Sequence, residues 1–202
     1  MLRHVAEIAE LMGRFDGGSG GGLAPRLRRE NRIRSIQASL AIENNTLSVD
    51  QVTAILDGKR VLGLPREIQE VRNAYDAYES LEKWQPDSIN DLLQAHALLM
   101  GKLADDAGRF RSSGVGIYRG ERLVHMAPTA DRVEHLVSDL FQWLRETDLH
   151  PLIAAAVTHY ELEFIHPFSD GNGRIGRLWQ TLILARWKPS LAYLPIEQPH
   201  SR

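Results

Sequence analysis

The chain has 202 residues, of which 43% are hydrophobic, and its formal net charge is −2 at pH 7. This length and apolar content predict one sizeable domain, and the weak negative charge does not suggest the clustered basic surface of a nucleic-acid-binding protein. The absence of cysteine excludes disulfides and thiol chemistry, and no apolar run approaches the ~20 residues of a membrane span. We therefore expect a soluble cytoplasmic protein that binds neither nucleic acid nor membrane.

The N-terminal part of the chain predicts two helices and a link. Residues 1–15 predict a short helix, and residues 17–22, nearly all glycine, predict a flexible link. A helix over about residues 29–44 follows, in which Ser39 and Glu43 lie four residues apart and share a face. Glu43 falls near the helix C-terminus, where a negative charge is disfavoured, so a cationic partner elsewhere in the fold would stabilise it. Taken alone, the segment is more typical of a solvated glutamate at a helix end.

Helical patterns continue through most of the remaining chain and are interrupted by one glycine-rich segment. Asn44 can end the second helix in a left-handed conformation, and Ser88 and Thr129 are expected to cap the helices that follow them. Between residues 109 and 128, two strand-like runs predict a β-hairpin. The further helices are predicted at residues 48–56, 65–84, 88–100, 129–145, 152–164 and from 172 or 173 to just before Pro189, and the strand-like runs at 115–118 and 123–126.

The densest group of chemically functional residue types lies between the last two predicted helices. Residues 166–177 read HPFSDGNGRIGR, which places a histidine, an acid, a Gly-Asn-Gly turn and two arginines within twelve residues. Histidine can accept a proton near neutral pH, and a carboxylate can hold a divalent cation that bridges phosphates. Glycines let backbone N–H groups approach an anion, the helix N-terminus favours phosphate, and arginines neutralise phosphate oxygens. The combination predicts phosphoryl or nucleotidyl transfer.

This run resembles the signature of the Fic family, His-Pro-Phe-x-acid-Gly-Asn-Gly-Arg-x-x-Arg, at every specified position. The resemblance implies a mainly α fold, a Fic-type helical bundle with one small β-hairpin called the flap. It also implies an enzyme that transfers AMP from ATP to a Ser, Thr or Tyr hydroxyl of a target protein and releases pyrophosphate. ATP would be the co-substrate, and Mg²⁺ the metal ion.

The resemblance assigns a role to each position of the run. His166 is expected to be the base that deprotonates the target hydroxyl, Phe168 the anchor that fixes the loop in the core, and Asp170 the Mg²⁺ ligand. The predicted phosphate-binding residues are Gly171, Asn172 and Gly173 as the anion hole for the α- and β-phosphates, Arg174 at the β-phosphate and Arg177 at the γ-phosphate.

A second resemblance concerns the helix predicted over about residues 29–44. Ser39, Glu43 and Asn44 match the inhibitory motif of Fic proteins, Ser/Thr-x-x-x-Glu-Gly/Asn. The match implies that Glu43 pairs with Arg177 and occupies the γ-phosphate space, so that ATP would bind with its α-phosphate turned away from attack. Because the helix precedes the core in the same chain, the inhibition would be intramolecular. Whether Glu43 also supports removal of AMP from the target stays open.

The predicted hairpin occupies the position of the family's flap, which captures the backbone of the target protein by β-strand addition. An ordinary surface hairpin is the alternative interpretation of these runs. The residues expected to dock the target are Val115, Gly116, Ile117, Val124, His125 and Met126.

The expected layout has three parts: an N-terminal helix and linker at residues 1–22, an inhibitory helix region at 23–64, and the catalytic core with a C-terminal tail at 65–202. Because the motif does not recognise the donor's base, transfer of UMP, phosphocholine or phosphate, or combined AMPylation and de-AMPylation, stays open. A non-catalytic nucleotide-binding module is a further alternative, although binding alone would not need His166. The sequence also leaves a homodimer and auto-modification undecided.

Overall fold

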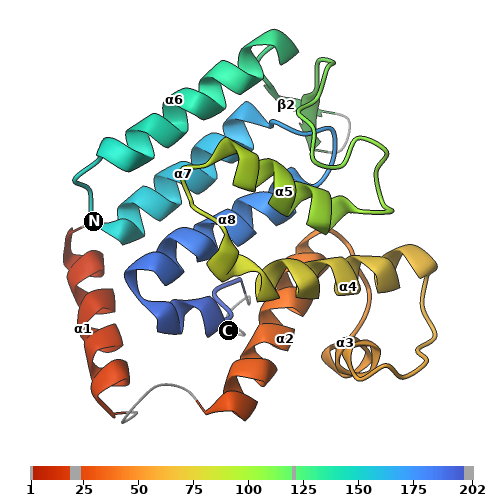
Figure 1. Ribbon diagram of the computed structural model, residues 1–202, viewed down its shortest axis with the longest axis vertical. Coiled ribbons are helices and arrows are strands. Elements are labelled where there is room, and N and C mark those ends of the chain that lie inside the picture. The colour runs from red at the N-terminus through yellow and green to blue at the C-terminus, as the bar shows by residue number, and fades with distance from the viewer. Residues whose placement is uncertain (1, 19–23, 120–121, 198–202) are drawn as a thin grey trace.

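The computed structural model describes residues 2–18, 24–119 and 122–197, and helices dominate it (Figure 1). One antiparallel hairpin accompanies them, which confirms the predicted mainly helical bundle with a single small hairpin. Most of the predicted glycine-rich link lies outside the described residues. The helices are α1 (Leu2–Gly18), α2 (Pro25–Ile42), α3 (Val49–Leu56), α4 (Pro65–Glu79), α5 (Ile89–Met100), α6 (Val133–Glu146), α7 (Pro151–Ile165) and α8 (Asn172–Trp187), and the strands are β1 (Gly116–Arg119) and β2 (Arg122–Met126).

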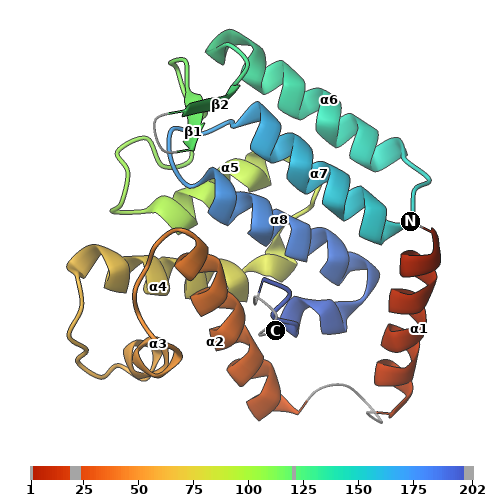
Figure 2. The ribbon, with the colours of Figure 1, turned by 180° about the vertical axis from the view of Figure 1, so that it is seen from behind.

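Helices α7 and α8 lie side by side at the centre of the molecule, with α6 outside α7 and with α2, α4 and α5 around α8 (Figures 1 and 2). Helix α8 is buried along nearly its whole length, and its buried residues include Arg174, Arg177 and Thr181 beside the apolar ones. Trp179 is its largest core residue and stacks between Phe141 of α6 and Trp84, with ring centroids 6.0 and 6.4 Å away. This packing fixes the helix whose first turn carries the second half of the motif.

Several predicted helix boundaries differ from the structure: α1 continues to Gly18, into the predicted link, and α2 already begins at Pro25. Thr129 accepts no cap hydrogen bond, because the chain first forms a 3₁₀ turn at Ala130–Arg132 and α6 begins only at Val133. The helix predicted over residues 65–84 ends at Glu79, and a 3₁₀ turn at Leu81–Lys83 follows. The caps at Ser88, whose side chain accepts from the Asp91 N–H, and at Asn44, whose φ is 65°, are confirmed.

The hairpin lies beside the connection from α7 to α8 (Figures 1 and 2). Its strands pair Gly116 with Met126 and Ile117 with His125. The pairing register then shifts between Ile117 and Tyr118. A bulge of this kind bends and twists the strand that carries it. The structure therefore confirms the hairpin, with β1 shifted by one residue toward the turn and β2 beginning one residue earlier than predicted.

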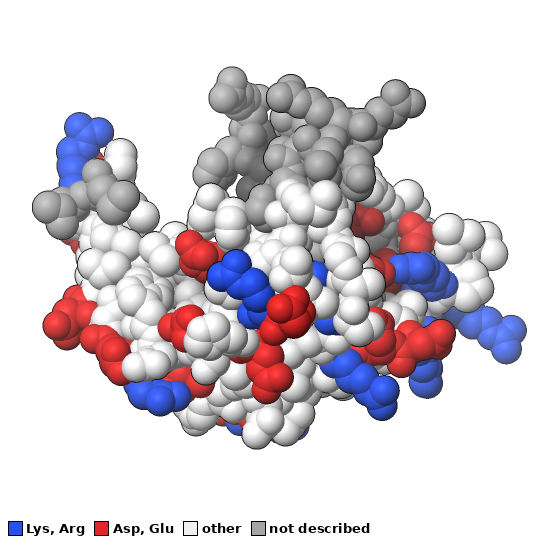
Figure 3. All heavy atoms as spheres, turned by 90° about the horizontal axis from the view of Figure 1, so that it is seen from above, with Lys and Arg blue, Asp and Glu red and all other residues white. Residues whose placement is uncertain are grey.

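Charges of both signs are scattered among uncharged residues on the face of the molecule that is seen from above (Figure 3). In Figure 3, acidic and basic side chains are interspersed over the described surface, as the net charge near zero would suggest. No described helix is both long and apolar enough to cross a membrane.

Candidate active site

The predicted catalytic loop connects the C-terminus of α7 to the N-terminus of α8. His166 follows α7 directly and adopts the left-handed conformation, with φ 51° and ψ 62°. For a residue with a side chain this conformation costs about 1–2 kcal/mol, so the surrounding contacts must maintain it. Gly171, the residue before α8, is also left-handed, with φ 82°. These two residues give the loop its sharp reversal between the antiparallel helices.

Phe168 and Asn172 hold the middle of this loop. Phe168 is completely buried, as the sequence predicts for the loop's anchor. The Asn172 side chain pairs with the Phe168 backbone at both ends: its Oδ1 accepts from the Phe168 N–H at 2.9 Å, and its Nδ2 donates to the Phe168 carbonyl at 2.8 Å. The Asn172 side chain therefore shapes the loop from inside, and only its backbone N–H can belong to the predicted anion hole.

His96 of α5 packs against the loop. The sequence did not identify this residue. Its ring stacks on Phe168, with centroids 3.6 Å apart and 6° between the planes. The Gly108 N–H donates to His96 Nδ1 at 2.9 Å, so Nε2 carries the proton and donates to the Asp170 carbonyl at 2.9 Å. Burial lowers the pKa of His96 and so favours this neutral form.

Gly171 lies tightly against α5. A Cβ atom there would approach Met100 Sδ to 2.7 Å and His96 Nε2 to 3.3 Å. The positive φ and this close approach both require glycine. The motif's first glycine is thus explained by packing of the loop onto α5, in addition to any approach of an anion.

Asp170, the predicted metal ligand, lies in a network of alternating charges. Its Oδ1 accepts from Arg174 Nη2 at 2.9 Å, and its Oδ2 accepts from Arg66 Nη2 at 3.1 Å. Arg174 is also 3.3 Å from Oε1 of Glu70, a largely buried residue of α4, and Arg66 is 3.4 Å from the same atom. Asn45 Nδ2 donates to the other oxygen of Glu70 at 2.9 Å. Arg66, Glu70 and Asn45 were not identified from the sequence.

Arg177, one turn further along α8, meets the predicted inhibitory residues. Its Nη2 donates to Glu43 Oε1 at 2.7 Å and to the Ser39 carbonyl at 3.0 Å, and its Nε donates to Ser39 Oγ at 2.9 Å. The Arg177 side chain is only 10% exposed, so solvent screens this charged contact weakly. Arg177 is thus the cationic partner that we expected from the position of Glu43 at the C-terminus of α2.

The Glu43 carboxylate also covers the first turn of α8. A Cβ atom at Gly173 would collide with Glu43 Oε1 and would lie 2.9 Å from Arg177 Nη1. The first N–H groups of a helix have no partner within the helix, and its N-terminal end favours negative charge. Glu43 therefore places its charge at the end of the helix where a phosphate would bind most favourably.

A second carboxylate approaches the same region from α7. A Cβ atom at Gly176 would meet Glu163 Oε1 at 2.9 Å and His159 Nδ1 at 3.1 Å, so these two side chains of α7 lie against Gly176 of α8. Burial raises the pKa of Glu163, and the charge of Glu43 raises it further, against the opposing effects of His159 and Arg177.

The predicted flap residues lie on the hairpin beside this loop. The backbone of Gly116, Ile117, Val124, His125 and Met126 belongs to its two strands, and Met126 is exposed. Val115 precedes β1, and its carbonyl accepts from the Ala127 N–H at 3.1 Å.

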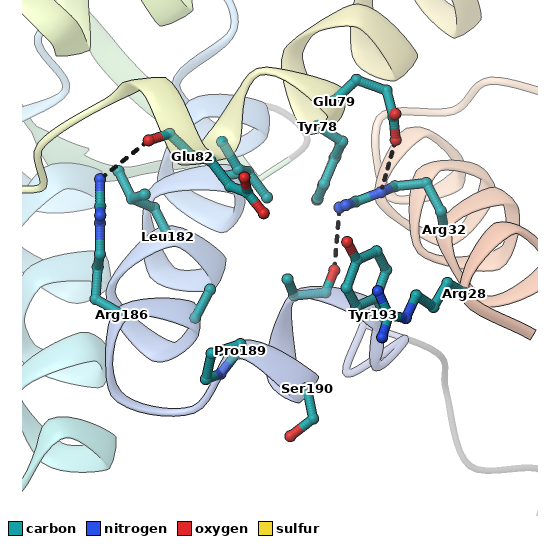
Figure 4. A pocket seen from close by; sticks show the side chains of 13 residues that line it. Arg28, Arg32, Tyr78, Glu79, Glu82, Leu182, Arg186, Pro189, Ser190 and Tyr193 are labelled. Carbon is teal, nitrogen blue, oxygen red and sulfur yellow. Dashed lines mark hydrogen bonds and ion pairs between the residues drawn. The ribbon is translucent and has the colours of Figure 1, made fainter. Parts of the chain in front are cut away.

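A cavity of about 930 Å³ lies elsewhere, between α2, α4 and the 3₁₀ turn Pro189–Tyr193 that follows α8, and none of the predicted site residues lines it (Figure 4). Arg32 of α2 points toward it and donates to the Ala192 carbonyl at 3.0 Å. The Arg32 guanidinium also lies 4.8 Å from the ring centroid of Tyr193. These contacts attach the segment after α8 to α2, the helix that carries Ser39 and precedes Glu43.

Comparison with known proteins supports the assignment from the motif. Residues 86–184 match the model of the Fic/DOC family. A crystal structure of a Fic family protein from Desulfovibrio desulfuricans G20 superimposes with a TM-score of 0.91 and is 64% identical, over 97% of this chain and 60% of that one. Fic-1 from Caenorhabditis elegans (residues 134–508) superimposes with a TM-score of 0.77 at 30% identity, over 92% of this chain and 56% of that one.

Curated relatives carry the name protein adenylyltransferase. The protein adenylyltransferase Fic of Nematostella vectensis is 32% identical over 177 residues, and protein adenylyltransferase fic-1 of C. elegans is 35% identical over 185 residues. These matches cover 80% and 85% of this chain, which spans 39% and 35% of the length of the two relatives. From its motif, its fold and these matches, the chain belongs to the Fic/DOC family.

Proposed function

We propose that this chain is the catalytic part of a protein adenylyltransferase that transfers AMP from ATP to a hydroxyl group of a target protein and is restrained by its own Glu43. The contact of Glu43 with Arg177 over the first turn of α8 is the observation that carries the restraint. The names of the curated relatives support the reaction.

His166 is the proposed base. It accepts the proton of the target hydroxyl as that oxygen attacks the α-phosphorus of ATP, the bond to the bridging oxygen breaks, and pyrophosphate leaves. The backbone N–H groups at Asn172 and Gly173, at the positive end of α8, stabilise the charge on the phosphates. Arg174 and Arg177 reach the leaving phosphates, where bidentate contacts neutralise negative charge.

Asp170 fits the proposed role of metal ligand. Its side chain is 46% exposed at the edge of the loop, and its partners are the Gly171 N–H and two arginines that phosphate can also bind. Mg²⁺ is usually held by one or two carboxylates together with substrate phosphates, so a single accessible aspartate is sufficient. When bound, the ion would neutralise phosphate charge in the transition state.

The proposed restraint acts through competition for Arg177. A carboxylate and a γ-phosphate cannot occupy the same guanidinium face, so ATP binds productively only when Glu43 moves away. The target docks on the flap by strand addition to the hairpin, which places its hydroxyl near His166. Auto-modification of the chain itself would follow the same chemistry.

Intact-protein mass spectrometry after incubation with Mg²⁺-ATP tests the reaction and its base. Glu43→Gly should gain one AMP, and Glu43→Gly/His166→Ala should gain none, because loss of a general base costs about 10²–10⁴-fold in rate. Glu30→Ala, a change of an exposed glutamate on α2, serves as the matched control and should behave like wild type.

The mass gained also separates the alternatives. A phosphate-sized gain in Glu43→Gly would contradict AMP transfer, as would modification with UTP or a phosphocholine donor but not with ATP. Equal labelling of Glu43→Gly with and without His166 would contradict the assignment of the base.

A further inference from the structure

We infer that Arg111 is a positioning residue. It fixes the backbone of His166 and both ends of the flap in position relative to each other. This inference deepens the proposed function and rests on it for its kinetic consequences. Arg111 is only 3% exposed, lies between α5 and β1, and was not identified from the sequence.

Arg111 holds the backbone on both sides of His166. Its Nε donates to the His166 carbonyl at 2.7 Å, its Nη2 donates to the Ile165 carbonyl at 3.2 Å, and its backbone N–H donates to the Pro167 carbonyl at 3.0 Å. Three consecutive carbonyl groups therefore bind one residue. Because His166 is left-handed, these bonds oppose its return to a more favourable backbone conformation.

The same side chain holds the two ends of the hairpin. Nη1 donates to the Ser113 carbonyl at 2.8 Å, just before the first strand, and Nη2 donates to the Pro128 carbonyl at 2.6 Å, just after the second. The guanidinium thus joins the carbonyls of Ser113, Pro128, Ile165 and His166, which we call the carbonyl cluster. A target strand docked on the flap would be registered against His166 through this cluster.

The geometry requires arginine in particular. The guanidinium is planar and presents donors from three nitrogens in fixed directions, and all three nitrogens are used here. A lysine ammonium has a single nitrogen and cannot span the cluster. Among the described residues Arg111 forms no ion pair, and burial lowers its pKa. Backbone carbonyl dipoles therefore stabilise its buried charge, and the residue does not serve to pair with a carboxylate.

Arg111→Lys and Arg111→Ala, each in the Glu43→Gly background, test the inference. We expect kcat for AMP transfer to fall about 10- to 100-fold in both variants, since small displacements of catalytic groups have effects of this size. The KM for ATP should stay within about twofold, because the carbonyl cluster holds no phosphate-binding residue and displacement of the base leaves ATP affinity intact. Arg109→Ala, an exposed arginine two residues earlier, is the matched control and should retain the kcat of Glu43→Gly.

Two further readouts separate positioning from general stability. Added guanidinium, well below denaturing concentrations, should restore part of the kcat of Arg111→Ala but not that of Arg111→Lys, because only alanine leaves the cluster open. Hydrogen–deuterium exchange should rise in peptides covering residues 113–128 and 165–170, and not in α4 or α8. Exchange is measured without ATP, so it tests whether Arg111 holds the carbonyl cluster even if Glu43→Gly transfers no AMP.

The inference is overturned if folded Arg111 variants keep the kcat of Glu43→Gly, or if exchange in the two peptides is unchanged. It is also overturned if kcat, ATP affinity and thermal stability fall together without guanidinium rescue, since that pattern indicates a structural role alone. If Arg111→Ala does not fold, Arg111→Lys decides by its exchange pattern and its kcat. An inactive Glu43→Gly with the predicted exchange pattern would contradict the proposed function and leave the cluster standing.

Discussion

At the scale of single residues, the site is built from side chains that bind and fix the backbone of the loop between α7 and α8. Asn172 binds both backbone groups of Phe168, His96 binds the carbonyl of Asp170, and Arg111 binds the carbonyl of His166. Each removes a local freedom that the loop between α7 and α8 would otherwise have. The chemistry assigned to the loop therefore depends on residues that would touch no substrate.

Gly171→Ala tests how much of the loop's shape rests on this glycine. The substitution adds the cost of a left-handed alanine, about 1–2 kcal/mol, to the overpacking against Met100, about 1–3 kcal/mol, so we expect a loss of about 2–5 kcal/mol in the free energy of unfolding. Gly58 has a similar φ of 75°, but a Cβ added there would meet nothing within 4 Å, so Gly58→Ala should lose only the first part. Equal losses in urea denaturation of the two variants would contradict the packing argument.

At the scale of elements, α2 is the helix on which the proposed restraint of Arg177 depends. One end of α2 reaches α8 through Ser39 and the following Glu43, and its middle is attached through Arg32 to the segment after α8. We therefore expect the attachment at Arg32 to affect the restraint even though it is remote from the motif.

Arg32→Ala tests this attachment. It removes a hydrogen bond to Ala192 and a ring contact with Tyr193, together about 1–3 kcal/mol, so AMP transfer by the otherwise wild-type chain should rise, by at most about 100-fold. The substitution also removes the contacts of Arg32 with Glu79 and Tyr78 of α4. In the Glu43→Gly background the same change should add nothing, because the restraint is already gone. Arg34→Ala, an exposed residue of α2, is the control, and a rise in that variant would show that any loosening of the helix suffices.

The packing of α7 on α8 gives a prediction about pH. Burial raises the pKa of Glu163 in the folded chain above its value in the unfolded chain, so ionisation of Glu163 destabilises the fold as pH rises through the folded pKa. Glu163→Gln should therefore be more stable than wild type at about pH 7.5, and the gain should vanish below about pH 4, where the carboxyl is protonated in the unfolded chain as well. Urea denaturation at the two pH values measures this, and a gain that is the same at both would contradict it.

At the scale of the whole molecule, the sequence predicted what lies within short windows and, through the inhibitory motif, the distant pair of Glu43 and Arg177, but it missed the other distant contacts of the site. The motif at residues 166–177, the helices around it and the hairpin follow from periodicity, turn residues and a family signature within short windows. Arg66, Glu70, His96 and Arg111 carry no such signal, because their partners lie far along the chain. A lone arginine or histidine acquires its role only when the fold supplies the carbonyl or carboxylate that it binds.

The central claim concerns Glu43, and the rate of AMP transfer from ATP radiolabelled at its α-phosphate, in wild type, Glu43→Gln and Glu43→Gly, measures it directly. The charged hydrogen bond to Arg177 contributes about 1.5–3 kcal/mol, so both substitutions should raise the rate about 10- to 100-fold. Glycine is common at the C-terminal end of helices, so Glu43→Gly should leave α2 folded. Glu30→Ala should leave the rate unchanged. Rates for the two Glu43 variants equal to wild type would contradict the account, and would mean that the Glu43–Arg177 contact stabilises the fold without restraining the reaction.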